Sequence, residues 1–284
     1  MSSMDAPEKI HIERNSAQET LVIPLYARAQ CARLYPKLYQ DPESERALER
    51  LDYDFSDRDA EGAAVRFGAL ECAMRQSDVA FEVREYLREH PRAAVVNLGC
   101  GLDPMTRNLD NGACTLYNLD RPDVIETRNL VFPPGPREHN IACDLTDHGW
   151  FGRIGADEGA VFFATGVFYY LLASDVQALV RAMNGAFPGG RLIFDTAGKL
   201  ALRIMVKGVV QGAAGIEGVD AYFHAGRPER DIVPWSNGFA VESRGYMLGY
   251  GDLRAAGVSA PFRLLARVCD GPMQMKIVRI DFAR

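Results

Sequence analysis

The sequence predicts an α/β protein built on a doubly wound, mostly parallel sheet of seven strands with an antiparallel edge. From Ala93 onward, short runs rich in Val, Ile, Phe and Tyr alternate with helix-compatible stretches. Continuous apolar runs that are each followed by a crossover helix are typical of parallel strands buried on both faces. Two later runs have no obvious long helix between them and suit an antiparallel pair at the sheet edge. The predicted strands are Ala93–Leu98, Cys114–Leu119, His139–Cys143, Ala160–Ala164 and Arg191–Asp195, followed by Val241–Gly249 and Lys276–Phe282.

Residues 1–90 are predicted to form a helical extension ahead of this sheet. Residues 1–15 show no pattern and are expected to be a loose tail. Pro24 interrupts the next helical segment early, so residues 19–39 should form two helices or one kinked helix. A further helix is expected from about Ser44 to Leu51, and a long helix over residues 60–89 should end at His90-Pro91.

Residues 91–284 are predicted to form the second unit, which contains the sheet. The helices expected between its strands are Asp103–Leu109, Asp123–Val131, Asp147–Ile154 and Ser174–Phe187. Residues 198–240 are Gly-rich and irregular, with one helix expected near Leu200–Val210. We therefore expect an irregular insertion there.

Composition narrows the class of protein. The chain has 284 residues, of which 48% are hydrophobic and 25% charged, as in ordinary globular proteins. The net charge of −6 argues against nucleic acid or an anionic membrane as the main partner. Six widely spaced cysteines without a C-x-x-C pair predict no metal site. A polar N-terminus and the lack of long apolar stretches predict a cytoplasmic protein.

A glycine loop follows the first predicted strand. The run Asn97-Leu98-Gly99-Cys100-Gly101 places two glycines where the chain must turn tightly and a ligand can approach the backbone. Asp120 ends the next strand, 21 residues after Gly99, and a carboxylate there can bind both hydroxyls of an adenosine ribose. The alternative is that Asp120 caps the helix opened by Arg121-Pro122. The combination favours nucleoside binding.

The kind of nucleoside depends on one position. A dinucleotide-binding loop has a third glycine three residues after the second, where the pyrophosphate meets a helix N-terminus. This chain has Pro104 there. S-adenosylmethionine contains adenosine but no phosphate, so it needs the glycine turn and the acid but not the third glycine. The residues therefore favour S-adenosylmethionine, with a nicotinamide dehydrogenase as the alternative.

The ends of the next strands carry further candidates. Asp144 and Leu145 follow the third strand and can bind the amine and cover the face of an adenine, although Asp144 could instead cap the next helix. Ala164, Thr165 and the aromatic run to Tyr170 follow the fourth strand. These aromatic rings could form a wall of the methyl-transfer pocket or be simple core.

Several motifs in this order resemble the leucine carboxyl methyltransferase family, and within it the bacterial polyketide-type O-methyltransferases. The resemblance covers about residues 16–200. It rests on PLYARA at residues 24–29, VVNLGCGLD at 95–103, NLDRPDVI at 118–125 with Arg128, and FPGG at 187–190. The resemblance implies a class I S-adenosylmethionine-dependent methyltransferase with a Rossmann-like fold, whose N-terminal helices form a lid over the active site. The acceptor would be a carboxylate or hydroxyl of a polyketide-like small molecule.

The resemblance also assigns residues. Arg75 would bind the donor's carboxylate, Gly99 and Gly101 the methionine part, Asp120 the ribose, and Asp144 with Leu145 the adenine. The remaining cofactor-binding positions would be Asn97, Cys100, Arg121, Ala164, Thr165 and Tyr170. Two positions depart from the family pattern: Thr165 stands where the family usually has Glu, and Pro104-Met105 replaces a common Thr-Arg.

The acceptor side is less defined. Tyr26 and Arg28 could contact the acceptor, or Arg28 could be a solvated helix residue. A carboxylate acceptor needs no base, whereas a hydroxyl usually does. His139, His148 and His224 are the plausible imidazoles, and none is assigned a catalytic role. A non-catalytic S-adenosylmethionine-binding module remains a further alternative because of Thr165. No nucleic-acid or membrane partner is expected, and the oligomeric state is open.

Overall fold

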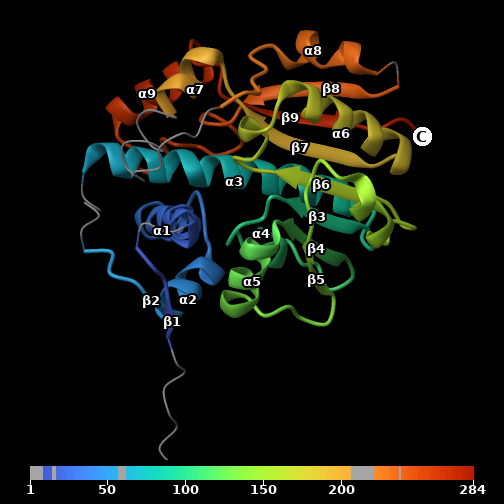
Figure 1. The fold of residues 1–284 in the computed structure, drawn as a ribbon. Coiled ribbons are helices and arrows are strands. Elements are labelled where there is room, and N and C mark those ends of the chain that lie inside the picture. Colours follow the sequence, from blue (N-terminus) through green and yellow to red (C-terminus); the bar gives the residue numbers. More distant parts are fainter. Residues whose placement is uncertain (1–8, 15–16, 57–61, 206–220, 237) are drawn as a thin grey trace, which may run out of the picture.

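A seven-stranded sheet forms the centre of the computed structural model, which describes residues 9–14, 17–56, 62–205, 221–236 and 238–284 (Figure 1). Five neighbouring strands are parallel, whereas β9 is antiparallel to both β7 and the edge strand β8. The predicted fold class is therefore confirmed. In spatial order the strands are β5 (Glu138–Ala142), β4 (Thr115–Asp120), β3 (Ala94–Leu98), β6 (Ala160–Ala164), β7 (Arg191–Thr196), β9 (Lys276–Asp281) and β8 (Ala240–Gly245).

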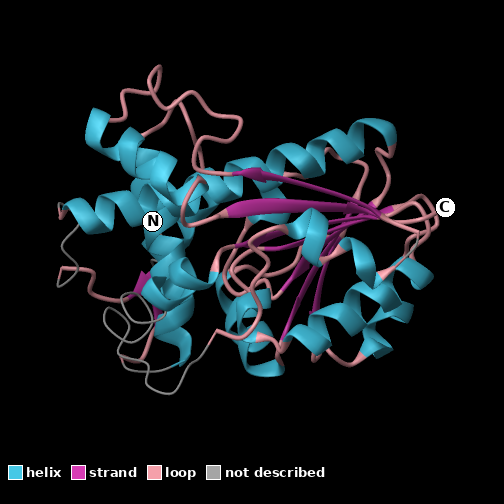
Figure 2. Cartoon of the chain, turned by 90° about the horizontal axis from the view of Figure 1, so that it is seen from above, coloured by secondary structure: helices cyan, strands magenta, loops and turns pink. Residues whose placement is uncertain are grey.

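Helices cover both faces of the sheet (Figure 2). One core joins it to α3 (Ala63–Glu89), α4 (Met105–Asn108), α7 (Lys199–Met205) and α9 (Ala260–Asp270). The other core joins it to α6 (Ala173–Ala186) and the 3-10 helix η1 (His148–Arg153). In β3, Ala94 and Val96 belong to the second core and Val95 to the first. Burial on both faces explains why the strands are continuous apolar runs rather than alternating ones.

The N-terminal elements form a third core with the glycine loop. Helices α1 (Ala17–Leu34) and α2 (Pro42–Arg50) and the short pair β1 (Ile10–His11) and β2 (Leu51–Asp52) pack around Leu25, Leu102 and Phe132. Figure 2 shows them beyond the end of the sheet opposite the C-terminus. Because β9 is antiparallel to the five parallel strands, that end carries their C-terminal edges. A lid function for these helices stays a prediction.

The structure differs from the predicted elements at several points. Helix α1 is continuous through Pro24, and Ile10–His11 is a strand rather than part of a loose tail. The element expected at Asp147–Ile154 is the 3-10 helix η1. Of the helix expected near Leu200–Val210, the structure describes Lys199–Met205, and the rest lies outside the described residues. The insertion further contains α8 (Pro228–Asp231) and the 3-10 turn Val233–Trp235.

Helix α9 was not predicted between the last two strands. Pro261 in its first turn was the available signal, because proline favours the start of a helix. The last N-terminal helix, α3, packs against β6, β7 and β9 and so belongs to the helical layer on the sheet. Within the described ranges, we find no helix with the length and apolarity needed to cross a membrane.

Candidate active site

Side-chain alternation directs polar groups from β3 and β7, the two strands on either side of β6, toward α3. In β3, Val95 packs in the core under α3, so Asn97 faces the same side two residues later. In β7, Ile193 packs in the same core, so Asp195 faces that side two residues later. Both residues lie near the C-terminal ends of parallel strands, which is where ligands bind in open α/β sheets.

The glycine loop after β3 has a backbone that other residues would strain. Gly99 and Gly101 have φ values of +66° and +47°. A Cβ at Gly99 would lie 2.6 Å from a methyl carbon of Val167, in the loop after β6. From the other side, the buried Arg128 guanidinium donates to the carbonyl oxygens of Gly101 and Asp103 at 3.0 and 2.8 Å. The loop is thus clamped between the end of β6 and α5 (Pro122–Val131).

Gly99→Ala is expected to lower the free energy of unfolding by about 1–2 kcal/mol more than Gly112→Ala, because a side chain forced into a packed site adds an overpacking cost. Gly112 has φ +84° and open space around its Cβ position, so its variant isolates the backbone strain. Urea unfolding of both variants measures the difference, and equal losses would contradict the close approach of Val167 to Gly99.

Asp120, the last residue of β4, holds the glycine loop directly. Its Oδ2 accepts the N–H of Gly101 and its Oδ1 the N–H of Arg121, each at 2.8 Å. The residue that caps α5 is Arg121, without a side-chain cap bond, so the carboxylate does not play the alternative capping role. Burial raises the pKa of Asp120, and the two N–H groups oppose that shift. The Arg121 side chain is exposed and pairs with Asp123.

The loop after β5 lies beside Asp120, because the N–H of Cys143 donates to the Asp120 carbonyl at 2.9 Å. Asp144 is exposed and accepts both the N–H and the hydroxyl of Thr146, which lower its pKa. Asp147 caps η1 instead, through the N–H of Gly149. Leu145 is buried. An exposed carboxylate next to a buried leucine is compatible with the predicted adenine site.

Arg75 points from α3 to the end of β7, where Nη1 donates to Asp195 Oδ2 at 2.9 Å. Glu71 and Asp78 lie four and three residues from Arg75 on the same helix, within reach of a surface pair, but neither pairs with it. Glu71 bonds to Tyr246, and Asp78 lies 3.8 Å from Arg244. Burial alone would lower the pKa of Arg75, but Asp195 holds it well above its ordinary value.

The end of β6 contacts the polar side chains that lie between α3 and the sheet. Ala164 is buried, and the Thr165 hydroxyl lies 3.5 Å from Asp103 Oδ2, which also accepts the Gln76 amide. Tyr170 is 42% exposed, and its partial burial raises its pKa. A glutamate at position 165 would place a second carboxylate beside Asp103, so the hydroxyl avoids a repulsion between like charges.

The two predicted acceptor residues lie on α1. Arg28 is buried, donates to the Leu102 carbonyl at 3.3 Å and lies 3.7 Å from Asp41, so it is not a solvated residue. It joins α1 to the glycine loop. Tyr26 is half-buried and stacks on Phe55 with ring centroids 4.6 Å apart. Contact of either residue with an acceptor stays a prediction.

Unpartnered buried atoms gather around these loops. Both amide atoms of Asn97, Nε of Arg75 and Oε1 of Gln76 have no hydrogen-bond partner among the described residues. Such atoms are costly unless a ligand or water satisfies them. They fit a ligand with charged and polar groups, such as the amino-acid end of S-adenosylmethionine. The Cys100 thiol stays protonated here, because burial raises its pKa to about 12.

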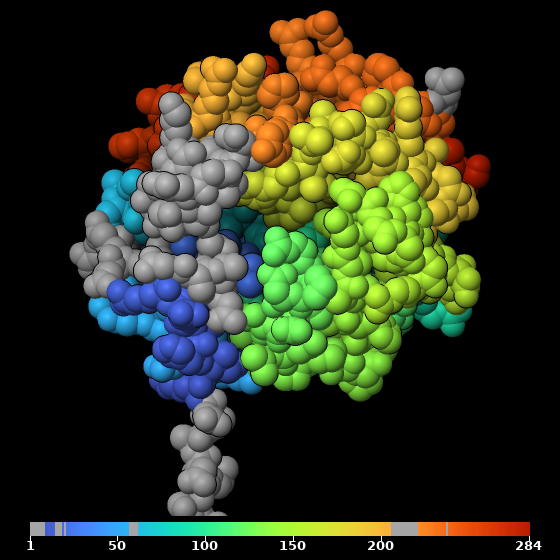
Figure 3. All heavy atoms as spheres, in the orientation of Figure 1, coloured from blue at the N-terminus to red at the C-terminus, as the bar shows by residue number. Residues whose placement is uncertain are grey.

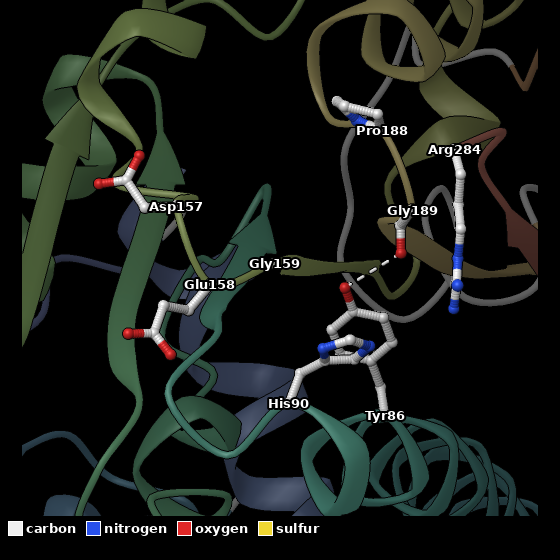
Figure 4. Close-up of a pocket in the computed structure, with 8 residues that line it drawn as sticks. All are labelled: Tyr86, His90, Asp157, Glu158, Gly159, Pro188, Gly189 and Arg284. Carbon is white, nitrogen blue, oxygen red and sulfur yellow. Dashed lines mark hydrogen bonds between the residues drawn. The ribbon is translucent and has the colours of Figure 1, made fainter.

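The surface is hollowed where these loops lie. Figure 3 shows a recess at the centre of this face, between the green surface around α4 and α5 and the yellow surface around β7. A cavity of about 660 Å³ lined by Tyr86, His90 and Arg284 lies elsewhere (Figure 4). It also contains Gly159 and Gly189, which precede β6 and β7, so it opens at the N-terminal edge of the sheet, away from the glycine loop.

The three candidate histidines do not lie together near the glycine loop. His139 stacks on Tyr117 at the β5 edge, and His148 stacks on Phe151 in η1. His224 is exposed, in a segment whose neighbours Phe223 and Ala225 donate to the Tyr169 carbonyl and the Thr196 hydroxyl. These bonds bring the segment that contains His224 to the C-terminal edge of the sheet.

Sequence reasoning did not assign Gln76, Asp103, Arg128 or Asp195 to the site. Asp195 ends the predicted strand Arg191–Asp195 and is the last residue but one of β7, so the signal used for Asp120 was available for it. Gln76 is adjacent to Arg75 on α3 and had no motif of its own. Arg128 was quoted as part of the resemblance, but its bonds to the loop carbonyls depend on tertiary structure.

Comparison with known proteins decides the family. Residues 25–184 match the leucine carboxyl methyltransferase family, which is more than half of the chain. The chain belongs to this family. It is a methyltransferase whose methyl donor is S-adenosylmethionine, as the sequence predicted, and the dehydrogenase and non-catalytic alternatives fall away.

Two relatives and one solved structure illustrate the similarity of this leucine carboxyl methyltransferase family member to known proteins. The chain is 28% identical over 200 residues to the tetracenomycin polyketide synthesis O-methyltransferase TcmP of Streptomyces glaucescens, covering 68% of this chain and 70% of that protein. It is 26% identical over 210 residues to the S-adenosyl-L-methionine-dependent methyltransferase dpfgK of Gibberella zeae, with the same coverage. A methyltransferase structure from Mesorhizobium loti has a TM-score of 0.52 at 19% identity, over 75% of this chain and 99% of that chain, and it shares the fold.

Proposed function

We propose that this enzyme transfers a methyl group from S-adenosylmethionine to an oxygen of a small, polyketide-like acceptor. The observation that carries the proposal is the clamped glycine loop, in which Asp120 holds the Gly101 N–H at 2.8 Å at the carboxyl edge of the sheet. The acceptor class is supported by the relative TcmP, whose name states polyketide synthesis.

In this proposal different residues bind the ribose, the adenine and the amino-acid end of the donor. Asp120 keeps lone pairs for the ribose hydroxyls while it orders the loop, and Asp144 with Leu145 frames the adenine. The amino-acid end lies along Gly99 and Gly101, with its carboxylate on Arg75 and its polar atoms within reach of Asn97 and Thr165. This arrangement satisfies the buried groups that have no protein partner.

Catalysis then depends mainly on alignment. The bound donor supplies a methyl group already activated by its sulfonium. The protein has to place the acceptor oxygen in line with it, and orientation of this kind can lower a barrier by roughly 7–11 kcal/mol. A carboxylate acceptor is ionised at neutral pH and needs no base, whereas a hydroxyl would use a base such as His224 at the sheet edge.

Calorimetry tests the donor. We expect the purified protein to bind S-adenosylmethionine and S-adenosylhomocysteine and to show no comparable affinity for NAD, because Pro104 replaces the third glycine of a dinucleotide loop. Tight NAD binding, together with no binding of either S-adenosylmethionine or S-adenosylhomocysteine, would overturn the proposed function.

Labelled donor tests the acceptor. A panel of polyketide-like carboxylic acids and phenols should yield at least one methylated product. Mild base releases methanol from a methyl ester and leaves an aryl methyl ether intact, so the product identifies which oxygen is the acceptor. Transfer to nitrogen or carbon acceptors alone would contradict O-methylation.

A further inference from the structure

One carboxylate joins three segments at the centre of the candidate site. Asp195 is 1% exposed at the end of β7. Its Oδ1 accepts the N–H of Gly166 at 2.7 Å, and its Oδ2 accepts Nη1 of Arg75 at 2.9 Å and the hydroxyl of Tyr169 at 3.0 Å. It therefore ties α3, the loop after β6 and the 3-10 turn η2 (Phe168–Tyr170) to the central sheet.

The Arg75 guanidinium has a strong partner on one edge and only a weak sulfur acceptor on the other. Nη1 is bonded to Asp195, whereas Nε has no partner among the described residues and Nη2 has a 3.9 Å contact with Cys72 Sγ. Nε and Nη2 carry two parallel N–H groups, which is the fork that a carboxylate accepts. The Nε N–H is buried without a partner in the described part of the chain, so a bound anion is the group that would satisfy it.

The guanidinium also has little freedom to turn. A Cβ at Gly166 would lie 3.5–3.8 Å from its Nη1, Nη2 and Cζ atoms, so the Gly166 backbone packs against the guanidinium group. Gly166 has φ +70°, a conformation that glycine favours, and its N–H is the one that Asp195 accepts. Asp195 thus fixes both the guanidinium and the backbone packed on it.

We propose that Asp195 is a positioning residue for donor binding: it holds the Nη1 edge of Arg75 so that the Nε and Nη2 edge meets the carboxylate of the donor. The proposal rests on the function proposed above for Arg75. It also gives Arg75 a permanent counter-charge, because an unpaired buried guanidinium is strongly unfavourable before a ligand arrives. The donor carboxylate then joins Asp195 on the guanidinium and does not displace it.

Two probes separate this role from a general structural one. S-adenosylhomocysteine contains the amino-acid end, whereas 5′-methylthioadenosine keeps the adenosine and the sulfur but lacks that end. We expect Asp195→Asn to weaken binding of S-adenosylhomocysteine about tenfold and to leave binding of 5′-methylthioadenosine within twofold. Equal weakening of both probes would indicate a structural role. Unchanged or tighter binding of S-adenosylhomocysteine would show that Asp195 does not position Arg75 or that it competes with the donor.

Coupling and stability controls complete the test. In the Asp195→Asn background, Arg75→Lys should weaken S-adenosylhomocysteine binding by less than it does alone, because the two residues act as a unit. Asp281→Asn is the matched control, since Asp281 pairs with Arg191 at the other end of the sheet and its loss should change neither probe. Full additivity of the first pair would contradict the proposal.

A second variant covers the case in which Asp195→Asn does not fold. Tyr169→Phe keeps the ring and removes one of the three donors on Asp195. We expect two- to threefold weaker binding of S-adenosylhomocysteine without a change for 5′-methylthioadenosine, and a variant equal to wild type would count against the proposal. Wild-type protein that fails to bind S-adenosylhomocysteine would instead refute the proposed function itself.

Discussion

Asp120→Ala is expected to weaken the binding of S-adenosylhomocysteine by about one to two orders of magnitude. Hydrogen bonds to a charged group contribute roughly 1.5–3 kcal/mol, and the variant leaves the ribose hydroxyls without their acceptor. It also frees the N–H groups of Gly101 and Arg121, which the carboxylate now holds at 2.8 Å. Calorimetry with S-adenosylhomocysteine measures the loss.

Asp123→Ala provides the control for Asp120. Asp123 is exposed three residues later and pairs with Arg121, so its removal alters local charge without touching the glycine loop. We expect its affinity for S-adenosylhomocysteine to stay within twofold of wild type. If a folded Asp120→Ala protein binds as tightly as wild type, Asp120 serves only to order the loop and is not part of the donor site.

Arg75→Lys is expected to weaken S-adenosylhomocysteine binding by about tenfold or more. A lysine ammonium is a point charge and cannot reproduce two parallel N–H groups, and here it would also have to satisfy Asp195. A solvated arginine in a surface pair would instead contribute only about 0.3–0.5 kcal/mol. Only 16% of the Arg75 side chain is exposed, so the larger effect is the expected one.

Arg88→Lys on the same helix is the matched control for Arg75. Arg88 is exposed and pairs with Glu85 one turn away, so the substitution should not change donor affinity. Thermal unfolding of both variants reports any loss of stability separately from binding. Donor affinity within twofold of wild type for Arg75→Lys would remove Arg75 from the site, and with it the positioning role of Asp195.

Local sequence patterns were sufficient to predict strands whose burial and residue spacing are set within one segment of the chain. The runs Ala93–Val96 and Val161–Ala164 are apolar because both faces of each strand are covered. The helix α9 and the position of β9 between β7 and β8 were not predicted. Which strand inserts between two others depends on pairing across the sheet, and no local signal in the chain specifies it.

By itself, the sequence determined the fold class, the glycine loop with Asp120 and the choice of S-adenosylmethionine over a dinucleotide. These depend on spacings of a few residues within one strand–turn–helix unit. The tertiary structure alone decided that Arg75 pairs with Asp195 rather than with Glu71 or Asp78, across 120 residues of chain. Neighbours on a helix are within reach of each other in any helix, but a buried guanidinium binds the carboxylate that the packed sheet presents to it, and only folding brings the two together.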